Sequence, residues 1–292
     1  MPWELENESD MKSMTILVES GATKSSWHLL NGDGIVVRQF MRPGMNVSTM
    51  KMEDILNIIS EAFSSENLGS IPGQFCLYTA GVVTPEVRIT IEKKVKAVSA
   101  VGSVDVQDDL VGAARAVCGR EPGIAAILGT GSNACYYDGV TAIRNVYSGG
   151  FILGDEGSGA ALGRLFLADF IKDLVPERVA EDFRSEFDSS YSAIVEGVYH
   201  SVSPSGYLGS FAPFILRHKD DPYVLNLLES NFQAFIDRIL LKYDTVSYPV
   251  GVVGGFAWAC RDILLPMLEK KGIRVTRILK APIEALCEYH TK

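Results

Sequence analysis

The stretch IAAILGTGSNACYY, residues 124–137, carries the pattern on which the fold prediction rests. Its first five residues form an apolar run typical of a buried strand, and residues 134–137 form a second strand-like run. Between them lies a turn of small residues, Gly129-Thr130-Gly131-Ser132-Asn133. Such a turn exposes backbone N–H groups and hydroxyls that can hold phosphate oxygens. It is not a Walker loop, because no Gly-Lys-Ser/Thr sequence opens a helix here.

A second stretch near the N-terminus, LVESGATKS at residues 17–25, has the same layout of strand, turn and strand. Its turn and Lys24 could hold phosphate oxygens, while Glu19 is placed to bind a hydrated Mg²⁺. Taken alone, such a segment is mostly just a hairpin. Two such turns at equivalent places in two halves would face one another across a cleft and grip a triphosphate. The predicted ATP-binding residues of the two turns are Gly21, Thr23, Lys24, Thr130 and Gly131.

The order of predicted elements indicates two related α/β halves. Three strands open the chain as an antiparallel meander up to residue 37, and helices and strands then alternate up to Cys118. After a break at residues 119–123 the strand pattern restarts, with a third strand at residues 145–146. A helical region extends to residue 244, and strand, helix, strand and helix close the chain. We predict two domains, 14–118 and 119–280, with a cleft between them, a helical insertion in the second, and a last helix (281–292) packed on the first.

Composition narrows the classes of function. Of the 292 residues, 27 are Lys or Arg and 36 are Asp or Glu, and the net charge of −9 argues against a nucleic-acid binder. The uncharged stretches fall short of the roughly 20 apolar residues that a membrane span requires. Residues 1–13 carry four acids and no apolar core of a secretory signal, so we expect a cytoplasmic protein. The five cysteines lack C-x-x-C spacing, as expected of buried thiols in a reducing compartment.

Two adjacent acids, Asp108 and Asp109, lie between a predicted strand and a helix at the junction of the halves. Either of them could be the N-cap of that helix. In the interpretation that we favour, Asp108 caps the helix or lies outside, and Asp109 points into the cleft. There Asp109 would accept a proton from a substrate hydroxyl, which is the acid–base work that phosphoryl transfer requires of the protein.

Two further glycine-rich segments are candidate binding loops. The first, residues 148–159, bears Asp155 and Glu156 before a helix, and either acid could bind sugar hydroxyls. The alternative is a helix capped by Ser158 with acids at its favourable end. In the second, Gly254 and Gly255 follow a late strand. There the backbone could approach the ring or ribose of ATP closely, or form a plain β–α turn.

Taken in this order, Glu19–Lys24, Asp109, Gly129–Asn133, Gly154–Ser158 and Gly254–Gly255 resemble the motifs of the sugar kinase, heat-shock-70 and actin superfamily. Within it the chain resembles the BadF/BadG/BcrA/BcrD ATPase-type family that includes N-acetylglucosamine kinase. The resemblance runs from about residue 14 to the end. It implies two ribonuclease-H-like, or actin-like ATPase, domains with a nucleotide and sugar cleft between them.

The resemblance also implies an activity, namely ATP-dependent phosphorylation of the 6-hydroxyl of a hexosamine, with N-acetylglucosamine as the first choice and with Mg²⁺ as cofactor. It makes Asp109 the catalytic base, and it allows a homodimer. The superfamily usually has Asp where this chain has Glu19, so the acid that organises Mg²⁺ stays open. The implied sugar contacts are Asn46, Gly131, Asn133 and Asp155.

Two other functions stay open beside the kinase. The same family contains ATPase activators of radical dehydratases and reductases, which hold a metal cluster with cysteines at a dimer interface. No cysteine of this chain lies in a matching context near the junction of the halves. A nucleotide-sensing switch without catalysis is the third alternative, but such a switch requires no partner for a sugar hydroxyl.

Overall fold

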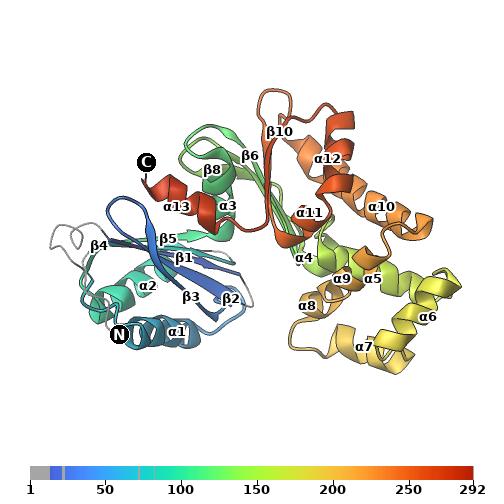
Figure 1. Ribbon diagram of the computed structural model, residues 1–292, viewed down its shortest axis with the longest axis horizontal. Coiled ribbons are helices and arrows are strands. Elements are labelled where there is room, and N and C mark those ends of the chain that lie inside the picture. Colours follow the sequence, from blue (N-terminus) through green and yellow to red (C-terminus); the bar gives the residue numbers. More distant parts are fainter. Residues whose placement is uncertain (1–13, 22–23, 72, 82, 292) are drawn as a thin grey trace. The chain divides into compact units, whose positions relative to one another are not determined.

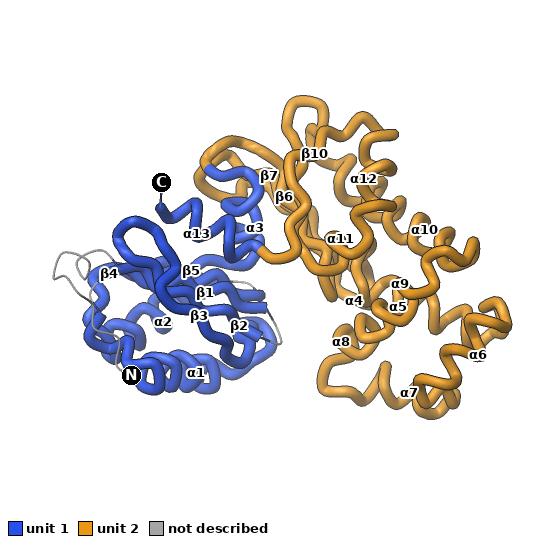
Figure 2. The backbone as a smooth tube through the Cα atoms, in the orientation of Figure 1, with its two compact units in different colours: residues 1–119, 282–292 blue, residues 120–281 orange. Residues whose placement is uncertain are grey.

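The computed structural model of the chain describes residues 14–21, 24–71, 73–81 and 83–291. The chain divides into two compact units, coloured separately in Figure 2: unit 1 contains residues 1–119 and 282–292, and unit 2 contains residues 120–281. Each unit has its own five-stranded sheet and its own hydrophobic core. The predicted α/β class is therefore confirmed.

Unit 1 begins with three strands and then alternates helices with strands (Figure 1). Its elements are β1 (Met14–Ser20), β2 (Lys24–Leu30), β3 (Val36–Pro43), α1 (Met52–Ser65), β4 (Gly73–Thr79), α2 (Pro85–Val98), β5 (Val101–Asp108), α3 (Asp109–Cys118) and α13 (Ile283–Thr291).

The sheet of unit 1 has the strand order β3-β2-β1-β4-β5. β1, β2 and β3 pair antiparallel, which confirms the predicted meander, and β4 and β5 extend the sheet parallel to β1. β3 continues to Pro43, whereas the sequence predicted its end at residue 37. The extension is stabilised on one face of β3, where Arg38 and Arg42 lie over the ring of Phe40 and both pair with Glu66.

Helices cover both faces of this sheet, with α1 and α2 on one face and α3 and α13 on the other (Figure 1). α1 forms because its apolar residues recur at helical spacing, and Ile55, Ile59 and Phe63 are buried against the sheet. Trp27 of β2 lies at the centre of this core, with its ring 5.9 Å from that of Phe75. Large aromatic side chains of this kind supply much of the area that a core buries.

The last helix, α13, belongs to unit 1 because it packs against α3 and β1. Polar contacts add to this packing. His290 lies 2.8 Å from the hydroxyl of Tyr78 on β4, and Arg115 of α3 donates to the same hydroxyl at 2.7 Å. Arg115 also pairs with Asp105 of β5 at 2.9 Å. These contacts connect α3, α13 and two strands of the sheet.

Unit 2 contains a second sheet and a long helical region (Figure 1). Its elements are β6 (Gly123–Leu128), β7 (Ser132–Tyr137), β8 (Ala142–Asn145), α4 (Gly150–Leu153), α5 (Gly159–Phe170), α6 (Glu177–Glu186), α7 (Tyr191–Tyr199), α8 (Pro204–Gly209), α9 (Ala212–Arg217), α10 (Pro222–Arg238), the 3₁₀ helix η2 (Leu240–Lys242), β9 (Val250–Val253), α11 (Gly255–Ala259), α12 (Arg261–Lys270) and β10 (Val275–Leu279).

The second sheet repeats the topology of the first. Its order is β10-β9-β6-β7-β8, in which β6, β7 and β8 pair antiparallel while β9 and β10 extend the sheet parallel to β6. The strand predicted at residues 145–146 lies earlier, at Ala142–Asn145. Because the same five-strand arrangement occurs twice, the prediction of two related halves is confirmed.

The helical region of unit 2 is organised around buried phenylalanines. Phe183 of α6 is 1% exposed. Its ring centroid lies 4.7 to 5.5 Å from the ring centroids of Phe170, Phe211 and Phe214. Pro204 and Pro222 are the first residues of α8 and α10, where a missing N–H costs nothing. Within the described part of the chain, no helix combines the length and apolar character that crossing a bilayer requires.

Candidate active site

In unit 1, acidic residues gather at the carboxyl ends of the parallel strands. The registers of β1, β4 and β5 place Glu19 beside Tyr78, and Tyr78 beside Gln107, one residue before these strands end. Residues that are register partners in neighbouring strands point to the same face of the sheet, so Glu19 and Tyr78 share a face. On that face Tyr78 contacts α3 and α13. Ligands of α/β folds bind at such strand ends. Asp109 begins α3 directly after β5.

The two adjacent acids have different roles in the local structure. Asp108 is the N-cap of α3, and its carboxylate accepts a hydrogen bond from the N–H of Val111 at 2.8 Å. Asp109 is the first residue of the helix and is partly buried. Burial, reinforced by the charges of Asp108 and Glu19, raises the pKa of Asp109 to about 7. A carboxyl with this pKa changes its protonation state near neutral pH, which suits a general base.

Glu19 lies close enough to Asp109 for the two charges to interact. Burial raises the pKa of Glu19, and the positive charge of Lys24 opposes that rise. Among the residues that the structure describes, no three His, Cys, Asp or Glu side chains are grouped to hold a metal ion. Mg²⁺ commonly takes only one or two protein carboxylates and fills its remaining positions with water and phosphate oxygens. The carboxylates at this strand end therefore fit a phosphate-bound Mg²⁺.

The first turn follows β1, and its Gly21 N–H donates to the carbonyl of Lys24 at 3.1 Å. The predicted ligand residue Thr23 lies outside the described residues. Asn46 follows β3 and forms a bridge with Ala80, just beyond the end of β4. Its side-chain oxygen accepts a hydrogen bond from the N–H of Ser48 at 3.0 Å. Asn46 thus lies next to the end of β4, whose neighbours are β1, which carries Glu19, and β5, which Asp109 follows directly.

In unit 2, the turn between β6 and β7 is tied to the loop that precedes α5. The carboxylate of Asp155 accepts a hydrogen bond from the N–H of Ser132 at 3.2 Å. A Cβ on Gly131 would lie only 3.2 Å from the same carboxylate. The carbonyls of Gly129 and Thr130 accept from the first residues of α5 at 2.9 and 3.0 Å. The structure therefore brings together three of the predicted residues, Thr130, Gly131 and Asp155.

Asp155 and Glu156, which the sequence could not separate, point to different partners. Asp155 is 7% exposed, and its burial raises the pKa of its carboxyl while the Ser132 hydrogen bond opposes the rise. Glu156 instead pairs with Arg238 of α10 at 2.8 Å. Ser158 is the N-cap of α5, as the alternative interpretation expected. The loop therefore contains both a helix cap and a carboxylate at the glycine turn.

Gly254 is required where β9 turns into α11. Its φ is +138°, and a Cβ there would lie 2.1 Å from the carbonyl oxygen of Leu128 at the end of β6. Only glycine permits this approach of two backbones without strain. At Gly255 a Cβ would meet no atom within 4 Å. The predicted pair thus consists of one glycine packed against the β6 end and one that faces open space.

Two residues of this region were not predicted from the sequence. The hydroxyl of Ser132 is buried and lacks a hydrogen-bond partner among the described residues. Asn231 of α10 is 2% exposed, accepts from the N–H of Gly157 at 2.9 Å and donates to the carbonyl of Ser158 at 3.1 Å. Ser132 lies inside a predicted motif and could have been included. Asn231 carries no local signal, because its partners are far away in the sequence.

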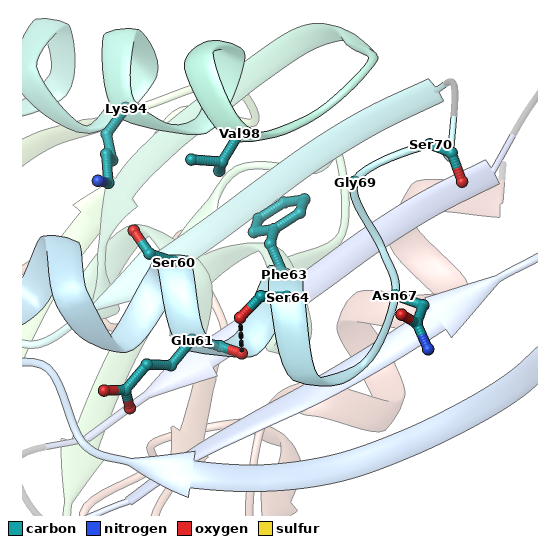
Figure 3. Close-up of a pocket in the computed structure, with 9 residues that line it drawn as sticks. All are labelled: Ser60, Glu61, Phe63, Ser64, Asn67, Gly69, Ser70, Lys94 and Val98. Atoms are coloured by element: carbon teal, nitrogen blue, oxygen red, sulfur yellow. Dashed lines mark hydrogen bonds between the residues drawn. The ribbon is translucent and has the colours of Figure 1, made fainter.

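A surface groove of unit 1 lies apart from these residues (Figure 3). It has a volume of about 600 Å³ and is lined by α1, α2 and the segment after α1, including Glu61, Phe63 and Lys94. None of the predicted site residues lines it. We therefore build the candidate active site on the strand ends and glycine turns.

Comparison with a solved structure identifies the family of this chain. A crystal structure of a proposed N-acetylglucosamine kinase from Porphyromonas gingivalis is 33% identical to this chain, with a TM-score of 0.84, and the match covers 96% of this chain and 98% of that one. The chain belongs to the N-acetylglucosamine kinase-like family. The predicted membership and the predicted actin-like ATPase fold are thereby confirmed.

Two further matches of this kinase-like chain have lower sequence identity. It is 28% identical over 155 residues to the N-acetylmuramic acid/N-acetylglucosamine kinase of Clostridium acetobutylicum, a match that covers 50% of this chain and spans about half, 49%, of that relative. It shares the fold of a proposed N-acetylglucosamine kinase from Chromobacterium violaceum, with a TM-score of 0.74 at 20% identity over 96% of this chain and 99% of that one. No protein-family model matches the chain.

Proposed function

We propose that the chain is an ATP-dependent sugar kinase that phosphorylates the 6-hydroxyl of a hexosamine, with N-acetylglucosamine as the first candidate. The observation that carries the proposal is Asp109, a partly buried carboxyl at the start of α3 with its pKa raised to about 7. Membership of the kinase-like family supports the reaction class. Because the proposed reaction consumes ATP, we infer a cytoplasmic location for the protein.

Asp109 is assigned as the general base. In phosphoryl transfer, the protein mainly positions the reactants and stabilises charge, while one residue accepts the proton of the attacking hydroxyl. An ordinary aspartate would be a weak base at neutral pH, since its pKa lies near 3.8. With its pKa at about 7, the Asp109 carboxylate accepts the hydroxyl proton more readily, while about half of the molecules stay deprotonated at pH 7.

The phosphate groups of ATP are assigned to the glycine turns. In unit 1, Lys24 offers an ammonium group, and Gly21, whose N–H donates to the Lys24 carbonyl, leaves the turn without a side chain at that point. In unit 2, Thr130 and Gly131 offer a hydroxyl and a backbone N–H. Gly255 leaves open space in which the base or ribose of a nucleotide would not meet a side chain. When bound, Mg²⁺ neutralises phosphate charge, and Glu19 is the carboxylate that we assign to it.

The sugar is assigned to four residues of the two units: Asn46, Gly131, Asn133 and Asp155. Asn46 and Asp155 offer an amide and a carboxylate, which bind hydroxyl and acetamido groups in both donor and acceptor directions. The partnerless Ser132 hydroxyl adds a group that a ligand could satisfy. N-acetylmuramic acid is the second substrate candidate, because the Clostridium acetobutylicum relative is named for both sugars.

The test is ADP release from the purified protein with Mg-ATP and a panel of hexoses and hexosamines, with mass spectrometry of the product. Strong stimulation by one amino sugar, with a phosphate on its 6-oxygen, supports the proposal. Slow ATP hydrolysis that no sugar stimulates would refute it and favour an activator or a nucleotide switch. Removal of Mg²⁺ with a chelator should abolish the stimulated rate.

A further inference from the structure

Two buried hydroxyls hold the backbone immediately before Asn46. Ser20 ends β1 and Thr79 ends β4, and the two are register partners in the parallel pair of strands. The N–H of Met45 donates to Ser20 Oγ at 2.7 Å, and Thr79 Oγ1 donates to the carbonyl of Met45 at 2.8 Å. All three residues are completely buried. Both polar backbone groups of Met45 are therefore satisfied by side chains of the central strands.

The Ser20 hydroxyl also connects this contact to the first turn. Its oxygen lies 3.2 Å from the carbonyl oxygens of both Met45 and Gly21. A hydroxyl has a single proton to donate, and the Met45 carbonyl already accepts from Thr79. The Ser20 proton is therefore best directed to Gly21, so that one side chain contacts both the glycine turn and the segment of Asn46.

The residues after Met45 are held from the other side. The N–H of Val47 donates to the carbonyl of Ala80 at 3.0 Å, and the N–H of Ala80 donates to the carbonyl of Ser20 at 2.9 Å. Asn46 lies between these two attachments and bridges to Ala80. The position of its side chain therefore depends on Ser20 and Thr79, whose hydroxyls bond to the backbone of Gly21 and Met45.

We propose that Ser20 and Thr79 are positioning residues for the amino sugar, and that they act by fixing Met45 and hence Asn46. The inference rests on the proposed function, in which Asn46 contacts the sugar. Both hydroxyls are buried, so their effect on the sugar is transmitted through the backbone. A purely stabilising role would change the melting temperature without changing the affinity for one substrate in particular.

The first test compares Thr79→Val with Thr79→Ser. Valine keeps the shape and removes the donor, which leaves the buried carbonyl of Met45 with a poorer partner, so the KM for the amino sugar should rise roughly tenfold. The KM for ATP should stay within about twofold, and Thr79→Ser should restore the sugar KM. Thr90→Val is the matched control, because Thr90 donates to the Glu86 carbonyl of α2 at 2.8 Å in an exposed hydrogen bond. If Thr79→Val does not fold, Thr79→Ala, which removes the same donor without adding a methyl group, is expected to give the same selective rise.

The second test does not depend on activity. Hydrogen exchange of the peptide that covers residues 44–50 should be faster in Thr79→Val than in wild type and Thr90→Val, since the Met45 segment is less firmly held. Unchanged exchange, or equal changes in the KM of sugar and ATP, overturns the inference. A wild-type protein that phosphorylates no sugar refutes the proposed function separately, and exchange still decides whether the two hydroxyls hold the segment.

Discussion

Replacing Asp109 by Asn should have opposite effects on activity and on stability. Asp109→Asn removes the proposed base while keeping the size of the side chain at the start of α3. Turnover of the amino sugar should fall by about 10² to 10⁴, which is the contribution of a positioned base. The free energy of unfolding should rise at pH 8, because the variant no longer buries a negative charge beside Asp108 and Glu19.

The size of the stability effect follows from the pKa of Asp109. The carboxyl has a pKa of about 7 in the folded protein and an ordinary value of 3.8, so the folded state binds the proton more tightly than the unfolded state. Stability is therefore lost as pH rises from about 4 to about 7, and the loss is complete above pH 7. The full difference corresponds to about 4 kcal/mol. Since Asp109 is only partly buried, we expect about 1 to 2 kcal/mol, or about 2 to 6 °C in melting temperature.

Thermal unfolding at pH 5 and pH 8, together with the ADP assay, tests both effects. The variant should melt higher than wild type at pH 8, and the difference should shrink at pH 5, where wild-type Asp109 is protonated. Nucleotide affinity should stay close to wild type. Turnover within tenfold of wild type would refute the assignment of the base. A variant that melts lower than wild type at pH 8 would refute the argument from buried charge.

Three further substitutions test the surroundings of the base and the second unit. Asp108→Asn should keep the helix cap, since Asn caps a helix as well as Asp does. It should also lower the pKa of Asp109 and so shift the acidic limb of the pH–rate profile to lower pH, and an unchanged profile would contradict this. Gly254→Ala should destabilise unit 2 by about 2 to 5 kcal/mol in denaturant unfolding, because its Cβ would meet the Leu128 carbonyl. Gly255→Ala should leave that stability unchanged but raise the KM for ATP, and an unchanged KM would remove Gly255 from the nucleotide site.

The sequence was sufficient for the parts of the fold that local chemistry determines. Short apolar runs separated by glycine turns predicted the three-stranded meander and its repetition in the second half. The end of β3 was missed, because the apolar run of the predicted strand ends at Val37 and the segment after it contains Arg38 and Arg42. Their burial depends on Phe40 and on Glu66, which belongs to another element. The short helix α4 was read as a glycine loop, and it buries none of its residues.

The candidate site shows the same division between local and distant signals. Asp109 and the glycine turns stand in recognisable patterns, so their residue types suggested their chemistry. Asn231 and Thr79 act through hydrogen bonds to segments that are distant in sequence, and only the folded registers of strand and helix bring them there. In the sequence these residues are polar residues outside any motif, so nothing local indicates their role.

The position of α13 has a consequence for the order in which the protein can fold during synthesis. The helix completes unit 1 by packing on α3 and β1, yet it leaves the ribosome after the whole of unit 2. Domains commonly fold as they emerge, from the N-terminus onward. Here unit 2, which is continuous in sequence, can fold completely first. Unit 1 stays incomplete until α13 is synthesised, because the surface of α3 and β1 that α13 covers is still exposed. A nascent chain that stops at residue 281 would therefore carry a finished second unit and an unfinished first one.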